Sequence, residues 1–432
     1  MIESYLFREE TDNLTILIQE VMRASPDGTH RFIEPSYGVL NSAKSRQHHI
    51  VFGRRGSGKS SLLRKAANDL TLERKAIAFI DLESFKAHAY PDVLVSILLK
   101  SMSEYRDWLH SAAIEPSNKS SFWKRFFGSP SKSSLNRKDV ESLDKQADAL
   151  ISKLNEILFQ PSELQLQEKR VDGSESTLTA SMSSDLSKIG TPLSTTLSGG
   201  KKEIHSKESN LSYTSKKIEY LQQNVFAYQQ FFKNLSRLTN GMACLFLDDL
   251  YHIRKTDQAE VLDYFHKIAK GNDLWIKVGT IRYRSEWYRH KPQSVGMKLG
   301  DDAVEINLDV TLEQYNSCKI FLTKVLKNLL EEAKIPSVGV MANDGAIDRL
   351  VIASGGVARD FVGIFGKAIK ITRDRGEAHH RGPRICVEDV NKASGEYDSH
   401  KWEEPKKKSR AFLMHSSHSL IFAQEMQNLM YS

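Results

Sequence analysis

The sequence predicts an α/β fold in which helices sandwich a parallel sheet, with a C-terminal helical lid and an inserted, coiled-coil-like helical arm. Three observations lead to this prediction. Short apolar runs alternate with helical periodicity in two separate blocks, which is typical of parallel α/β architecture. A serine- and lysine-rich stretch with helical edges separates the two blocks, and purely helical periodicity follows the second block.

The first block contains two strand–helix pairs, and one amphipathic helix precedes it near the N-terminus. The apolar face of that helix must pack on another part of the protein, and it consists of Leu14, Ile16, Leu17, Ile18, Val21 and Met22. A strand at 49–52 leads through a glycine-rich loop into a helix over 60–70. A second strand at 77–80 ends at an aspartate and precedes a helix over 91–109.

The second block completes the predicted sheet. Apolar runs at 243–247 and 274–278 predict two further strands, and the alternating pattern at 304–308 predicts a third. The periodicity of 258–269 predicts a helix between the first two. With the strands of the first block they would form one parallel sheet.

Helical periodicity dominates from Leu312 onward and predicts the lid. One apolar stripe consists of Tyr315, Ile320, Phe321, Val325, Leu329 and Leu330. Two further helices are expected over 344–353 and 358–372. The tail after Ala393 is polar, with a run of three lysines and one last helical stretch from about Ser419.

The stretch between the two blocks, about 117–215, has the composition of a weakly ordered insertion. Its edges carry two apolar seams whose spacing averages about 3.5 residues, as in a coiled coil. The seams are Leu143, Ala147, Leu150, Leu154 and Ile157, and Ile218, Leu221, Val225, Tyr228, Phe232 and Leu235. Two alternatives stay open: an antiparallel arm that projects from the core, or two helices that lie against the core.

These patterns divide the chain into successive segments. They are an N-terminal helical segment (1–45), the first part of the core (46–116), the inserted arm (117–238), the second part of the core (239–310), the lid (311–396) and a basic tail (397–432). Basic and aromatic residues interleave over 119–132. That cluster fits the base of the arm, a surface for single-stranded nucleic acid, or contact with a membrane surface.

Composition argues against several classes of protein. Hydrophobic residues make up 40% and charged residues 27% of the chain, which argues against wholesale disorder. A net charge of +7 permits contact with DNA without demonstrating it, because 54 acidic residues nearly offset 61 basic ones. Three separated cysteines (Cys244, Cys318 and Cys386) argue against a disulfide framework. Without a membrane-length apolar run or a basic signal-peptide n-region, we expect a cytoplasmic protein with no membrane partner.

The glycine-rich loop at 53–60 carries the strongest functional signal. It reads Gly-Arg-Arg-Gly-Ser-Gly-Lys-Ser and matches a phosphate-binding loop in its expected place between a buried strand and a helix. Backbone N–H groups would face the phosphates, Lys59 would neutralise β- and γ-phosphate charge, and Ser60 would ligate Mg²⁺. The predicted nucleotide-contacting residues are Gly53, Arg54, Arg55, Gly56, Ser57, Gly58, Lys59, Ser60 and Ser61.

Such a loop needs a carboxylate on a neighbouring strand. Asp248 and Asp249 directly follow the apolar run at 243–247, which places them at the carboxyl edge of a parallel sheet. Asp248 would hold Mg²⁺ through a water, and Asp249 would orient or deprotonate the attacking water. Asp81, at the end of the strand at 77–80, is the second candidate for this carboxylate, because its context is that of a connecting strand.

Together these residues resemble the P-loop class that contains the AAA+ and STAND ATPases. The segment 277–282, Lys-Val-Gly-Thr-Ile-Arg, is similar to the STAND sensor strand, which implies nucleotide-sensing roles for Thr280 and Arg282. The segment 355–360, Gly-Gly-Val-Ala-Arg-Asp, resembles the sensor-2 segment of ORC/Cdc6-type ATPases. It implies that Arg359 reaches the γ-phosphate. The segments 8–10 and 386–393 resemble the N-terminal helix and the closing lid helix of that family.

The sensing role of Arg359 is also supported by its position in the sequence, but a second interpretation stays open. A guanidinium at the start of a lid helix can reach the γ-phosphate and report its presence, or it can pair with Asp360 at the surface. The roles of Arg282 and Arg284 stay open in the same way, because either residue could sense nucleotide or act as an arginine finger in a neighbouring subunit.

The chain departs from the family pattern at its paired acids, after its lid, and in the insertion between the second strand and Asp248, which has no assigned counterpart. Asp248-Asp249 replaces the Asp-Glu usual in AAA+ enzymes, which fits STAND switches better and leaves the hydrolysis rate open. After Glu396 about 36 residues remain, fewer than the roughly 70 of the winged-helix domain that follows the lid in ORC-like proteins. We therefore expect either that this domain is missing or that the chain is a truncated form.

We therefore predict a Mg²⁺-dependent ATPase whose nucleotide state drives a conformational change or oligomeric assembly. The predicted catalytic residues are Asp249, Lys59, Arg359 and Arg282. The lid would close on ATP through Arg359, and the arm would transmit the change to a protein partner. The resemblance implies a homo-oligomer that uses ATP, in systems such as phage defence, transposition or replication. The alternatives are a nucleotide-held scaffold with negligible hydrolysis and a DNA-loading ATPase.

Overall fold

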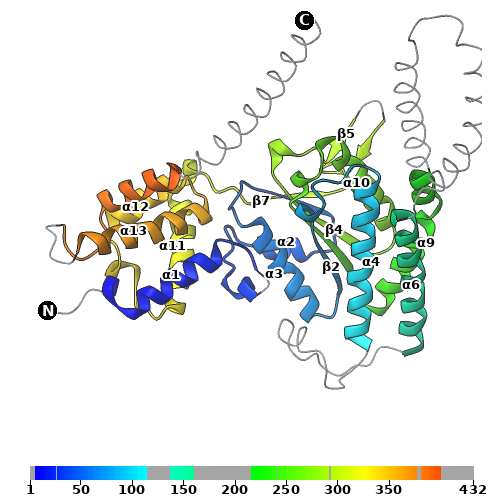
Figure 1. Cartoon of the computed structure of the whole chain (residues 1–432), viewed down its shortest axis with the longest axis horizontal. Coiled ribbons are helices and arrows are strands. Elements are labelled where there is room, and N and C mark those ends of the chain that lie inside the picture. Colours follow the sequence, from blue (N-terminus) through cyan, green and yellow to red (C-terminus); the bar gives the residue numbers. More distant parts are fainter. Residues whose placement is uncertain are drawn as a thin grey trace, which may run out of the picture. The chain divides into compact units, whose positions relative to one another are not determined.

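The computed structural model describes residues 5–25, 27–113, 137–159, 216–239, 241–290, 293–376 and 381–399, which form two compact units (Figure 1). The first unit contains the described parts of Met1–Val39, the loop Gly53–Ser61 and the described part of Leu308–Ser432. The second contains Leu40–Phe52 and the described part of Leu62–Asn307. Each unit has its own apolar core built from segments that are distant in sequence.

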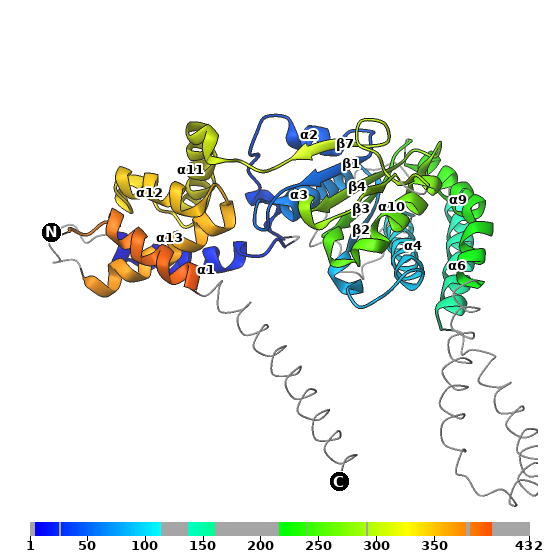
Figure 2. The same ribbon diagram turned by 90° about the horizontal axis from the view of Figure 1, so that it is seen from above.

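A five-stranded parallel sheet lies at the centre of the second unit and confirms the predicted α/β fold (Figure 2). Its strands are β1 (His49–Phe52), β2 (Ala76–Asp81), β3 (Ala243–Asp248), β4 (Leu274–Thr280) and β7 (Val304–Asn307), in the order β2-β3-β4-β1-β7. All neighbouring strands run parallel. Their carboxyl ends therefore lie at one edge, with Asp248 beside Asp81 and Thr280 beside Phe52.

Helices flank this sheet. The long helix α4 (Asp92–Ala113) packs against β2, and α10 (Lys255–Ala269) packs against β4. The short helix α2 (Val39–Lys44) precedes β1, and α3 (Lys59–Leu72) follows it. From Leu62 onward α3 belongs to this unit and buries an apolar face. The central strands β3 and β4 are largely apolar, because nearly all of their residues are buried between the flanking helices.

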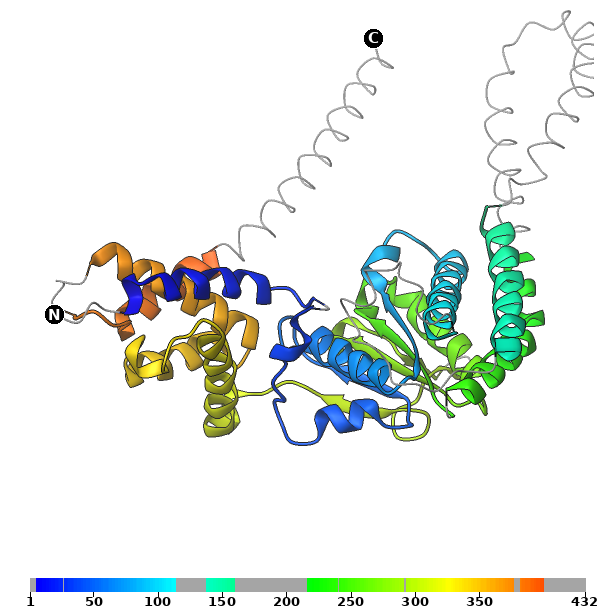
Figure 3. The same cartoon turned by 90° about the horizontal axis from the view of Figure 1, so that it is seen from below.

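The two seam helices are α6 (Arg137–Phe159) and a helical stretch over 216–223 continued by α9 (Val225–Leu238). In Figure 3, α6 (teal) and α9 (green) lie side by side, and α6 also packs against α4 while α9 packs against α10. Most seam residues are buried with the strands: Leu143, Ala147, Leu154, Leu221, Tyr228, Phe232 and Leu235. The described lengths of these helices therefore lie against the core, the second of the two alternatives. The region between 160 and 215 lies outside the described residues.

The first unit is helical and contains the predicted lid. Its helices are α1 (Glu9–Val21), α11 (Tyr315–Glu332), α12 (Asp344–Ser354), α13 (Ala358–Arg375) and a last helix over 387–399. The predicted N-terminal helix finds its partner here, because α1 packs against α11 and α13 and buries Leu14 and Ile18 among them. For two residues of the predicted apolar faces the prediction of burial is wrong, since Ile16 is 55% exposed and Ile320 is 58% exposed.

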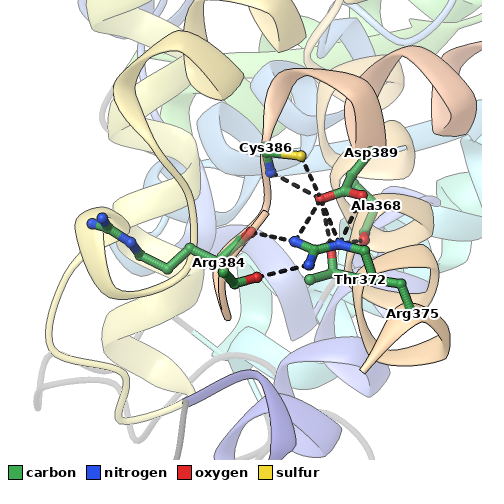
Figure 4. A network of polar contacts seen from close by, with 7 residues as sticks. Ala368, Thr372, Arg375, Arg384, Cys386 and Asp389 are labelled. Carbon is green, nitrogen blue, oxygen red and sulfur yellow. Dashed lines mark hydrogen bonds and ion pairs between the residues drawn. The ribbon is translucent and has the colours of Figure 1, made fainter. Parts of the chain in front are cut away.

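A buried polar network holds the last helix of the lid to the end of α13 (Figure 4). The Asp389 carboxylate is 2% exposed and accepts hydrogen bonds from Arg375, from Thr372 Oγ1 and from the backbone N–H of Cys386. Arg375 also donates to the carbonyl oxygens of Gly382 and Arg384. Burial raises the pKa of Asp389, but hydrogen bonds from Arg375 and Cys386, together with the charge of Arg375, outweigh burial and leave that pKa lowered. Asp389 therefore stays ionised and fixes the path of the chain into the last helix.

Some features fall outside the predictions or outside the described residues. A small antiparallel hairpin, β5 (Tyr288–Arg289) with β6 (Val295–Gly296), was not predicted because its strands are too short to show a pattern. The basic and aromatic cluster over 119–132, the lysine run over 406–408 and the helix expected from Ser419 lie outside the described residues. Within the described ranges, no helix combines the length and apolarity needed to cross a bilayer.

Candidate nucleotide-binding site

The loop at 53–60 has the backbone of a phosphate-binding loop. The N–H of Ser57 donates to the carbonyl of Arg54 at 3.1 Å and closes a turn at the start of the loop. Gly56 and Gly58 have φ angles of 88° and 95°, a left-handed conformation that other residues adopt only with strain. Alternating left-handed glycines turn successive N–H groups toward a common centre, which is an anion-binding arrangement. Helix α3 begins at Lys59, directly behind this loop.

Lys59 lies inside the loop rather than on its surface. Its side chain is 5% exposed, and Nζ donates to the carbonyl oxygens of Gly53 at 2.9 Å and Arg54 at 3.2 Å. The ammonium group is therefore held at the centre of the turn by the loop's own backbone. In that place it can exchange carbonyl partners for phosphate oxygens without a change of the fold.

Arg359 belongs to the same unit as this loop and contacts it. The backbone N–H of Arg359 donates to the carbonyl of Gly56 at 3.2 Å. A Cβ at Gly56 would lie 2.8 Å from the Cβ of Arg359, so glycine is needed for this approach as well as for its φ angle. Asp360, the alternative partner of Arg359, accepts a hydrogen bond from the hydroxyl of Tyr397 at 3.2 Å. Among the described residues, the Arg359 guanidinium forms no ion pair and no hydrogen bond.

The second unit contains the acidic residues at the end of β3. Asp248 is 3% exposed, and it fits beside β4 only because residue 279 is glycine. A Cβ at Gly279 would lie 2.7 Å from Oδ1 of Asp248 and 2.8 Å from Leu63. The missing side chain therefore leaves a cradle for a carboxylate. Sequence reasoning missed Gly279, because the space that it leaves is filled from a neighbouring strand.

Asp249 and Asp81 occupy different settings at the same edge of the sheet. Asp249 has a left-handed backbone, with φ 58° and ψ 48°, at the sharp turn that follows β3. Outside glycine this conformation is easiest for Asn and Asp. Asp81 is exposed and accepts a hydrogen bond from the N–H of Glu83 at 3.0 Å, which caps a short 3₁₀ turn. Asp81 thus has a structural role of its own as the cap of this turn.

The predicted sensor residues of β4 make contacts within the second unit. Thr280 is fully buried and its hydroxyl is hydrogen-bonded to the hydroxyl of Ser285. Arg282 forms an ion pair with Glu305, and its guanidinium stacks over the ring of Phe52 at 4.0 Å from the centroid. These contacts hold Arg282 at the carboxyl edge of the sheet, beside the last residue of β1. A sensing or finger role for Arg282 stays a prediction.

One comparison with known proteins identifies the family. The model of a protein family described as ORC-CDC6-like matches residues 25–381 of the chain. The chain belongs to the ORC-CDC6-like family. This confirms the resemblance to ORC/Cdc6-type AAA+ ATPases that the loop and lid segments indicated. Among curated proteins, the comparison finds no match to the chain.

This member of the ORC-CDC6-like family also contains a buried cluster that its sequence did not reveal. Lys277 of β4 is fully buried, and its Nζ donates to the carbonyl oxygens of Ser45 and Gln47, each at 2.7 Å, and to Nδ1 of His49 at 2.9 Å. Burial lowers the pKa of Lys277 to about 8, and burial with the nearby Lys277 charge lowers the pKa of His49 to about 3. Since Lys277 pairs with His49 at the start of β1, this cluster lies away from the edge that holds Asp248. We assign it a structural role.

Proposed function

We propose that this chain is a Mg²⁺-dependent ATPase that couples its nucleotide state to a change of the helical lid, and through it to oligomeric assembly or a partner. The observation that carries the proposal is the loop at 53–60, with its left-handed glycines, its enclosed Lys59 and its direct contact with Arg359. A phosphate loop joined to a lid arginine has the parts needed to bind ATP and to report the third phosphate.

Each residue has a separate role in this proposal. Backbone N–H groups of the loop, together with the ammonium of Lys59, bind the phosphates. Asp249 orients the attacking water or takes its proton, and Thr280 fixes the end of β4 beside β1. Arg359 contacts the γ-phosphate and so favours ATP over ADP. On the family resemblance alone, we also propose a preference for ATP over GTP, a homo-oligomer, and a role in phage defence, transposition or replication.

Mg²⁺ would neutralise phosphate charge during the reaction. The donors present suit this hard cation, because Asp248 offers carboxylate oxygens in the cradle beside Gly279 and Ser60 offers a hydroxyl. We therefore propose Ser60 and Asp248 as the residues that hold the metal.

Gly279→Ala tests the metal assignment. The added methyl group should displace the Asp248 carboxylate, and we expect the Mg²⁺ concentration for half-maximal ATP turnover to rise about 10-fold. A Mg²⁺ titration of turnover measures this change. Binding of ATP in the presence of EDTA serves as the control, because it does not require Asp248.

Crowding of Leu63 by the same methyl group is the competing explanation. Gly279→Ala combined with Leu63→Ala removes that second clash and keeps the first. If the Mg²⁺ requirement of the double variant returns to the wild-type value, the effect came from packing and Asp248 is not the metal ligand.

Turnover of the wild-type chain tests the function as a whole. We expect slow release of phosphate from ATP that stops when EDTA removes Mg²⁺, with or without DNA present. ATP that is bound and retained without turnover would instead favour the scaffold alternative, in which assembly follows binding alone. That alternative draws support from Asp249, whose side chain is one methylene shorter than the glutamate usual at this position. Strong stimulation by DNA with a steep salt dependence would favour the DNA-loading alternative.

A further inference from the structure

We propose that Arg54 positions Arg359 against the phosphate loop, as the link between this loop and the lid. The inference rests on the proposed function, because it assigns Arg54 a part in how Arg359 senses the γ-phosphate. Arg54 was predicted as one of the residues that contact nucleotide. Its contacts point instead to an indirect role.

Arg54 is anchored to the chain segment that leads into the lid. Its backbone N–H donates to Oδ1 of Asp309 at 2.7 Å, and Nε approaches the same oxygen at 3.4 Å. Its Nη2 donates to the carbonyl of Val310 at 2.9 Å. The N–H of Arg54 is therefore directed at Asp309, so this group is not among those that face a phosphate in the loop.

The same guanidinium reaches the turn that places Arg359. Nη2 of Arg54 donates to the carbonyl of Gly355 at 2.9 Å. Gly355 caps the C-terminus of α12 in a left-handed conformation with φ 58°, four residues before Arg359. A carbonyl at a helix C-terminus carries partial negative charge, which favours a cation.

This turn packs closely against the segment at 309–310, to which Arg54 is also bonded. Gly356 has φ 81°, and a Cβ there would lie 2.4 Å from the carbonyl of Val310. The segment at 309–310 and the turn at 355–356 are thus packed tightly, and the Arg54 fork spans both. From this turn the chain enters α13, where the N–H of Arg359 donates to Gly56. Two residues of the loop therefore hold the start of α13: Arg54 through the preceding turn at Gly355, and Gly56 through the N–H of Arg359.

The fork geometry of arginine is essential to this arrangement. A guanidinium presents several N–H groups in one plane and can serve an acid and two carbonyls together, whereas a lysine is a single point charge. Arg54→Lys should therefore keep the charge and lose the positioning. Arg55, the next residue, is exposed and makes no hydrogen bond or ion pair among the described residues, so it provides a matched control.

The test is calorimetric measurement of the dissociation constants of ATP and ADP for five proteins: wild type, Arg54→Ala, Arg54→Lys, Arg55→Ala and Arg359→Ala. Arg359→Ala should lower the preference for ATP over ADP by roughly 10- to 150-fold, since only ATP offers the third phosphate. Arg54→Ala and Arg54→Lys should each lower it by roughly 10-fold through misplacement of Arg359. Arg55→Ala should change both affinities by the same factor.

The double variant Arg54→Ala/Arg359→Ala separates positioning from direct contact. If Arg54 acts through Arg359, the double variant should lose no more ATP preference than Arg359→Ala alone. Additive losses, or an Arg54→Ala preference equal to that of Arg55→Ala, would overturn the inference and leave the proposed function intact. An unchanged preference in Arg359→Ala would overturn both. Thermal melting without nucleotide checks that every variant is folded.

Discussion

Replacing Lys59 by alanine is expected to weaken ATP binding by about 100-fold or more, a loss of about 3 kcal/mol. The reason is the position of the ammonium, which the loop's own carbonyls hold at its centre with only 5% of the side chain exposed. No other cation of the loop is enclosed in this way, since Arg54 and Arg55 are exposed. The measurement is the dissociation constant of ATP, with the ATP-induced rise in melting temperature as a second readout.

Lys65→Ala is the matched control for Lys59→Ala. Lys65 lies on the same helix and forms an ordinary i,i+4 ion pair with Asp69 at 3.0 Å. Its loss removes the same charge and costs only a few tenths of a kcal/mol. We expect Lys65→Ala to bind ATP as the wild type does. If Lys59→Ala bound ATP as tightly as Lys65→Ala, the loop at 53–60 would not be a phosphate loop.

Most strands of this fold were predictable because they are buried, with β1, β3 and β4 almost wholly so. Short apolar runs bounded by polar residues predict the strands that helices cover, and the alternating pattern at 304–308 predicts the edge strand β7. Each of the five predicted segments is a strand. The position of Asp248 followed from the same pattern, since the residue after a buried parallel strand lies at the carboxyl edge.

The packing of the seam helices could not be predicted from spacing alone. A seam that repeats at about 3.5 residues fits a partner helix and also fits the side of a core, because both accept one apolar stripe. The choice depends on α4 and α10, whose faces meet α6 and α9 only in the folded chain. The same limit applies to Ile16 and Ile320, whose helices bury a narrower stripe than the sequence indicates.

The contacts of the candidate site were least predictable where they join distant segments. Arg54 meets Gly355 across 301 residues of chain, and nothing near either residue signals the other. Gly279 is necessary because of an aspartate on the next strand, so its role appears only with the strand order. Motifs therefore predicted the loop and the acids as a site, whereas the residues that position them became apparent only in the structure.

Asp249→Asn is expected to lower ATP turnover by about 100- to 1,000-fold with little change in ATP affinity, the usual loss on removal of a general base. Asparagine is the substitution that the backbone allows. At φ 58° an alanine would add strain, and any loss of activity would then be ambiguous. Asparagine tolerates this conformation and keeps the shape of the side chain, so it removes only the carboxylate charge.

Asp81→Asn completes this experiment, because Asp81 ends the neighbouring strand at the same edge of the sheet. Single-turnover measurement of ATP cleavage separates chemistry from binding and product release. We expect slow cleavage in Asp249→Asn and near wild-type cleavage in Asp81→Asn, whose amide oxygen can still cap the 3₁₀ turn at Glu83. The reverse result would transfer the catalytic role to Asp81. Equal rates in both variants and the wild type would show that neither carboxylate acts as a base, so cleavage would then rest on the loop and Arg359.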